Sequence, residues 1–155
     1  MAKKVMERRA SDNAYLHKDF HGALSAGIDY LDRRCGEEAV REFLRRFTVS
    51  FYAPLIAELK AGGLAALRDH FERIYKLEDG EVETVLTDDE LVVRVAGCPA
   101  VSHMRRHGYR VARLWHETTE TVNAALCEGT PYGAELIEYD DRTGRAVFRF
   151  HRRQP

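Results

Sequence analysis

The spacing of apolar residues changes once along this chain, near residue 80, and that change constrains the fold more than any other feature. Before it, apolar side chains recur every three or four residues, as in Leu16, Phe20 and Leu24, a period typical of helices. After it, residues 82–86 and 91–95 alternate between apolar or threonine side chains and polar ones, which predicts a β-hairpin. We therefore expect an α+β fold, with N-terminal helices packed on an antiparallel sheet built from two hairpins.

Glycine and proline positions set the expected boundaries. The expected helices cover about residues 12–34, a segment from 37 onward, 64–76, 99–108 and 111–128. Residues 53–60 are either a kinked continuation of the second helix or a separate short helix, because Pro54 interrupts the pattern. The second hairpin pairs about 134–139 with 146–151, and residues 78–80 are read as a turn. Residues 1–11 are expected to be a flexible leader and 12–155 a single domain.

Composition excludes several classes of protein. The chain has 155 residues and a formal net charge of −1, so electrostatics give no reason to expect a nucleic-acid or membrane partner. The first nine residues are charged rather than apolar, and no apolar run is long enough for a membrane span. An odd number of cysteines, three, fits a reducing compartment, so we expect a cytoplasmic protein. A homodimer formed through an exposed strand is an open alternative.

The helix expected at 111–128 carries a polar stripe. His116, Glu120, Asn123 and Cys127 fall within a sector of roughly 60° at 100° per residue, and none of them is basic like the lysines and arginines of an ordinary solvated face. A histidine and a glutamate four residues apart can share a proton or a metal ion. The alternative is an ordinary polar face with Cys127 packed as a small side chain.

Two further sites contain cysteine or histidine. Cys98 stands where a strand ends and a helix begins, a position that favours the thiolate, and His103 follows five residues later. The alternative for Cys98 is a buried structural cysteine. His17 and His21 are four residues apart on one side of the first expected helix, a spacing used for metal pairs. The alternative is a histidine pair hydrogen-bonded to the backbone or to Asp19.

Three motifs in the second half resemble a known family. They are residues 93–100 (VRVAGCPA), 114–117 (LWHE) and 144–150 (GRAVFRF). Over about residues 90–151 the chain resembles the L-2-amino-thiazoline-4-carboxylic acid hydrolase-like family. It is similar, more distantly, to 4-vinyl-reductase-type domains, which have a comparable α+β sensor-like layout. Two cysteine positions of the family are His116 and Val147 here, so its three-cysteine site does not carry over intact.

The resemblance implies a hydrolase that acts on a C–N bond of a small heterocyclic or amino-acid-like substrate. Cys98 and His116 would form its centre, either as a zinc or iron site or as a nucleophile and its base. Glu117 or Glu120 would orient the histidine or move a proton, and His17 and His21 would complete the cavity.

The alternative function is a non-catalytic cytoplasmic module that binds a small ligand, a metal ion or heme. The same pocket would serve without turnover. The aromatic residues that could enclose an apolar ligand are Phe20, Phe47, Phe51, Trp115, Phe148 and Phe150.

Overall fold

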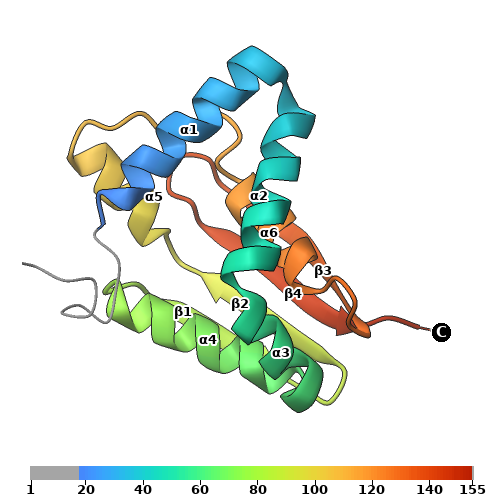
Figure 1. The fold of residues 1–155 in the computed structure, drawn as a ribbon. Coiled ribbons are helices and arrows are strands. Elements are labelled where there is room, and N and C mark those ends of the chain that lie inside the picture. Colours follow the sequence, from blue (N-terminus) through green and yellow to red (C-terminus); the bar gives the residue numbers. More distant parts are fainter. Residues whose placement is uncertain (1–17, 155) are drawn as a thin grey trace, which may run out of the picture.

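A computed structural model describes residues 18–154. The expected leader at 1–11, His17 and the first part of the expected first helix lie outside the described residues. The helices of the described part are α1 (Phe20–Cys35), α2 (Glu37–Phe51), α3 (Ala53–Gly62), α4 (Leu64–Leu77), α5 (Pro99–Arg106) and α6 (Glu117–Leu126). The strands are β1 (Val82–Leu86), β2 (Glu90–Val95), β3 (Tyr132–Tyr139) and β4 (Ala146–Arg152). Figure 1 shows these elements along the chain.

The four strands form one antiparallel sheet in the order β1-β2-β4-β3. Each expected hairpin is present, and β2 joins them by pairing with β4. In this pairing Leu91 lies opposite Phe150 and Val93 lies opposite Phe148. All four side chains are buried, so the inward face of both central strands is apolar, as the alternating sequence requires. The predicted α+β fold is confirmed.

The helices build on one another as well as on the sheet. α4 packs against β1 and β2, and α6 packs against β3, while α2 rests on α6 and α1 rests on α2 (Figure 1). The buried apolar residues fall into two clusters. The first, around Leu67 and Phe150, lies between the sheet and α3, α4 and α6; the second, around Ile28, Val40 and Met104, joins α1, α2 and α5. None of the described helices is both long and apolar enough to cross a membrane.

Of the two alternatives for residues 53–60, the structure has the separate helix, α3. One expected boundary changes: α6 begins at Glu117 rather than at about residue 111. The segment before α6 forms consecutive turns in which the Trp115 N–H bonds the carbonyl three residues earlier, at Ala112. Leu114 and Trp115 are neighbours and are both buried.

Gly144 brings the second hairpin against the start of α5. Its φ is +68°, and a Cβ added there would overlap the Cβ of Cys98. The neighbouring Thr143 carbonyl accepts a hydrogen bond from the Cys98 N–H at 2.9 Å. Glycine is therefore required by both conformation and close approach, and the contact fixes the position of Cys98.

We expect Gly144→Ala to lower the free energy of unfolding by about 1–3 kcal/mol more than Gly108→Ala, because of the overlap with Cys98. Gly108 is the matched control, since its φ is +73° but no atom lies within 4 Å of an added Cβ. Urea unfolding of both variants measures the difference. Equal losses would show that the close approach to Cys98 is not a constraint.

Candidate functional site

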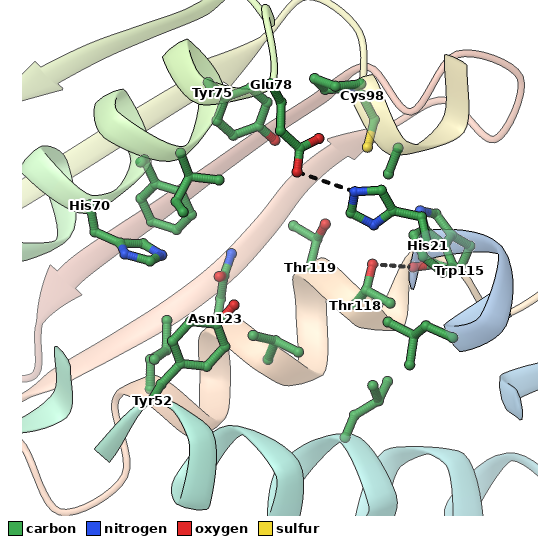
Figure 2. Close-up of a pocket in the computed structure, with 18 of the residues that line it drawn as sticks. His21, Tyr52, His70, Tyr75, Glu78, Cys98, Trp115, Thr118, Thr119 and Asn123 are labelled. Atoms are coloured by element: carbon green, nitrogen blue, oxygen red, sulfur yellow. Dashed lines mark hydrogen bonds and ion pairs between the residues drawn. The ribbon is translucent and has the colours of Figure 1, made fainter. Parts of the chain in front are cut away.

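A pocket of about 220 Å³ lies where the two hydrophobic clusters meet. Residues from α1, α2, α4, α6 and β4, together with the segment 98–100, line it. Its aromatic lining residues are Phe20, Phe47, Phe51, Tyr52, Phe71, Tyr75, Trp115 and Phe148. Most of the pocket is therefore apolar, and the polar side chains gather at its two ends (Figure 2).

One end is formed by His21, Glu78 and Cys98, with Tyr75 and Trp115 beside them (Figure 2). His21 Nε2 and Glu78 Oε1 are 3.1 Å apart, and the two side chains are 16% and 7% exposed. Glu78 is the residue at which α4 ends, and its backbone N–H bonds the carbonyls of the last helical turn. The end of one helix and the start of another thus place a carboxyl and an imidazole together inside the protein.

Burial sets the protonation of this pair. It raises the pKa of the Glu78 carboxyl from 4.5 to about 7, against a smaller opposing effect of the His103 charge. It lowers the pKa of the His21 imidazole from 6.5 to about 4, and the charges of His103 and Lys18 act in the same direction. At neutral pH the imidazole is therefore neutral, and the carboxyl is divided between its acid and its carboxylate. A group with these properties can give or take a proton near pH 7.

Cys98 faces the same end of the pocket (Figure 2). Burial raises the pKa of its thiol, although the backbone N–H groups of Val101 and Ala100 and the Trp115 side chain oppose that change. The N-terminus of α5 thus acts in the direction that the sequence predicted, but desolvation outweighs it. At neutral pH Cys98 is a thiol.

Asn123 forms the other end, near Tyr52 and His70 (Figure 2). It is only 5% exposed, and its side-chain amide forms no hydrogen bond with another described residue. The amide atoms are not sealed in the protein but open onto the cavity. Burial lowers the pKa of the neighbouring His70 to about 4, with the Arg73 charge adding to the effect. This end is therefore polar but uncharged, and it presents a donor and an acceptor to the cavity.

The charge of the lining limits what can bind. None of the described residues that line the pocket is lysine or arginine, and both lining histidines are neutral at pH 7. A buried anion needs a cationic partner or several hydrogen-bond donors. The pocket therefore favours a neutral or cationic ligand over an anionic one.

His116 belongs to a second group, which is separate from the lining of the pocket. It precedes α6, with Nε2 3.7 Å from Glu117 Oε1. Glu117 is 2% exposed and accepts hydrogen bonds from Arg41 at 2.8 Å and from the Thr121 hydroxyl at 2.5 Å. Its charge is thus already paired across α2 and α6, and the contact ties those helices together.

Among the donors expected for zinc or iron, His17 lies outside the described residues, and the described ones do not surround one point. Within the described residues, the group of three donors that approach within 4.8 Å of one another is His116, Glu117 and Glu120. Arg41 already occupies the Glu117 carboxylate, and Cys98 and His21 lie in the pocket instead. This arrangement does not fit a mixed Cys/His metal site, so no chemical step is assigned to a metal.

The remaining predicted residues have structural surroundings. His103 Nε2 lies 3.1 Å from Asp19 Oδ1, outside the pocket lining. Cys127 is fully buried in the cluster beneath the sheet, where burial raises its pKa to about 11. Of the residues predicted from the sequence, the structure thus brings Cys98, His21 and Asn123 to one pocket.

Glu78 is the residue of the candidate site that the sequence does not indicate. The sequence predicts a turn at 78–80, and the positive φ of Asp79, 56°, agrees with it. The carboxyl of Glu78 meets His21 of α1, which is 57 positions away in the sequence. No local pattern around residue 78 signals this long-range contact.

Comparison with protein-family models and with curated proteins finds no match for this chain. The resemblance drawn from its motifs stays a prediction, and the site has to be interpreted from its geometry.

The Glu78 carboxyl should make stability depend on pH. Its pKa in the folded protein, about 7, is above its ordinary 4.5, so the folded state holds an extra proton between these values and stability falls as pH rises through them. Glu78→Gln removes this loss, because glutamine does not titrate. We expect the stability of the variant minus that of wild type to be larger at pH 8 than at pH 4.5, by up to about 3 kcal/mol.

Urea unfolding at the two pH values measures this difference. Glu83→Gln is the matched control, because Glu83 is exposed on β1. Its free energy of unfolding should differ from that of wild type by the same amount at both pH values. His21 has the opposite effect, because its lowered pKa makes the free energy of unfolding rise with pH between about 4 and 6.5. All three proteins contain His21, so its effect is common to them. If the stability difference between Glu78→Gln and wild type is the same at both pH values, the raised pKa of the buried Glu78 carboxyl is contradicted.

Proposed function

We propose that this protein is a small-molecule-binding module whose ligand occupies the pocket between the two hydrophobic clusters. The observation that carries the proposal is Asn123, whose amide opens onto the cavity and hydrogen-bonds no described residue. Apolar pockets with a few convergent polar groups are the usual form of ligand sites. The free donor and acceptor of the amide can therefore pair with a ligand without breaking a contact within the protein.

The pocket also limits the ligand. A volume of about 220 Å³ is below the roughly 300–1,000 Å³ of sites for drug-sized molecules, so a molecule of heme size does not fit. The ligand has an apolar or aromatic body, because aromatic side chains dominate the lining. It carries hydrogen-bonding groups that reach one or both polar ends.

Two further observations support a cytoplasmic module of this kind. Cys35, Cys98 and Cys127 are all free, as expected in a reducing compartment. The resemblance to 4-vinyl-reductase-type domains, with their sensor-like layout, points to the same class of function.

A second candidate function is hydrolysis of a C–N bond, favoured by the presence of Cys98, His21 and Glu78 at one end of the pocket (Figure 2). In this reaction neutral His21 takes the thiol proton, and the Cys98 sulfur attacks the carbon bonded to nitrogen. The C–N bond then breaks, and the Glu78 carboxylic acid gives its proton to the departing amine. Water finally cleaves the thioester, which releases the acid and restores the thiol.

Binding is the function that the geometry supports better. The raised pKa of Cys98 favours the unreactive thiol. The base expected from the sequence, His116, lies outside the pocket lining.

The proposal is tested by filling the pocket. Thr119 lines it from α6, whereas Ala124 is exposed on the same helix. We expect wild type and Ala124→Phe to bind benzyl alcohol and benzamide, with amide chemical shifts changing at the lining residues. Thr119→Phe should weaken both by at least about tenfold, because its ring occupies the space of the ligand. Binding unaffected by Thr119→Phe would place the probes elsewhere and overturn the proposal.

The same benzamide samples separate the two functions. A binding module leaves the probe intact over days, whereas a hydrolase releases benzoate and ammonium. Release that is lost in Cys98→Ser would support the second function.

A further inference from the structure

We propose that the His21–Glu78 end of the pocket binds the protonated amine of the ligand, with Glu78 as its counter-ion. The inference rests on the proposed function and names the chemical class that this site selects.

Glu78 has no cationic side chain paired with it. Glu78 is 7% exposed, and among the described residues its side chain contacts one polar partner, His21, through Oε1. A carboxylate is stable at such a depth when a cation is paired with it. On the side away from the pocket, Lys18 lies 3.9 Å from Asp79 and His103 lies 3.1 Å from Asp19. Arg106 lines the same surface hollow as Glu78 but forms no ion pair with its carboxyl. The site thus has a buried acid that no lysine or arginine among the described residues contacts.

Aromatic side chains surround this end of the pocket. Trp115 and Phe20 lie edge-on to the His21 ring, with centroids 6.4 and 6.5 Å away, and Tyr75 stands beside Glu78 (Figure 2). Aromatic rings attract an ammonium group through their negative faces, and the attraction increases when water is excluded. A carboxylate and several rings at the end of an apolar cavity favour an amine attached to an apolar body.

Glu78 can become charged when a cation binds beside it. The titratable and charged groups around it, in the pocket and in the surface hollow on its other side, are Lys18, His21, Tyr75, Asp79, Glu81, Cys98, His103 and Arg106. Burial keeps His21, Tyr75 and Cys98 uncharged at neutral pH, and the His103 charge lowers the pKa of Glu78. The carboxyl itself has a pKa of about 7 in the free protein. Binding of an ammonium ion therefore releases the Glu78 proton when the pH is below 7.

Calorimetric titration with three matched probes tests the inference. They are benzylamine, benzyl alcohol and benzoate, which share a ring and differ in charge. We expect benzylamine to bind wild type at least about tenfold more tightly than benzyl alcohol at pH 8, and benzoate to bind weakest. Benzylamine affinity should fall about tenfold from pH 8 to pH 6, as Glu78 becomes protonated.

Proton release on binding is a second measurement, and it would not occur if Glu78 had a purely structural role. Titrations at pH 6 in two buffers of different ionisation enthalpy should show close to one proton released for each benzylamine bound, and little release at pH 8.5. Glu78→Gln should abolish the release and weaken benzylamine by at least about tenfold, while benzyl alcohol affinity changes less than about threefold. Glu83→Gln, on exposed β1, should behave as wild type.

The outcomes distinguish this inference from the proposed function. If benzyl alcohol or benzoate binds as tightly as benzylamine, or if Glu78→Gln binds benzylamine as wild type does, the amine assignment is wrong and the pocket remains a ligand site. If none of the three probes binds wild type, the proposed function itself is overturned.

Discussion

The antiparallel pairing of β2 with β4 is the contact on which the rest of the structure depends. It joins two hairpins into one sheet by pairing residues that are more than fifty positions apart in the sequence, and it places Phe148 and Phe150 beneath α4. The helices then pack on two separate apolar clusters rather than one. The pocket lies where these clusters meet, so its position follows from the topology. Gly144, beside β4, then brings Cys98 to the end of that pocket.

The two ends of the pocket hold polar groups that the protein itself leaves incompletely paired. The Asn123 amide opens onto the cavity and hydrogen-bonds no described residue, and burial shifts Glu78 and His21 toward their neutral forms. These two pKa shifts cost stability at the pH values where the groups would be charged in the unfolded chain. Strain and unmet polar contacts of this kind gather at functional sites, where a ligand supplies what is missing.

The sequence predicts the fold class well because the two periods, near 3.6 and 2, are set by which side chains face the core. It misplaces the start of α6, because burial of the adjacent Leu114 and Trp115 is a tertiary effect. For the site, Cys98, His21 and Asn123 were identifiable as unusual residues at unusual positions. Glu78 was not, because its partner His21 is 57 positions away in the sequence and no local pattern marks the turn. The later start of α6 also places His116 before the helix, beside Glu117, rather than within its polar stripe.

The central claim is that Asn123 presents its amide to a ligand, and Asn123→Leu tests it most directly. Leucine has a similar shape and no polar group, and the amide has no contact with a described residue to lose. The variant should therefore keep the wild-type free energy of unfolding to within about 1 kcal/mol and lose at least about fivefold in affinity for benzamide. Thr118→Val is the contrast, because the Thr118 hydroxyl bonds the Trp115 carbonyl at 2.7 Å, and it should lose stability. Urea unfolding together with a benzamide titration decides the matter. An Asn123→Leu variant that binds benzamide as wild type does would contradict the account.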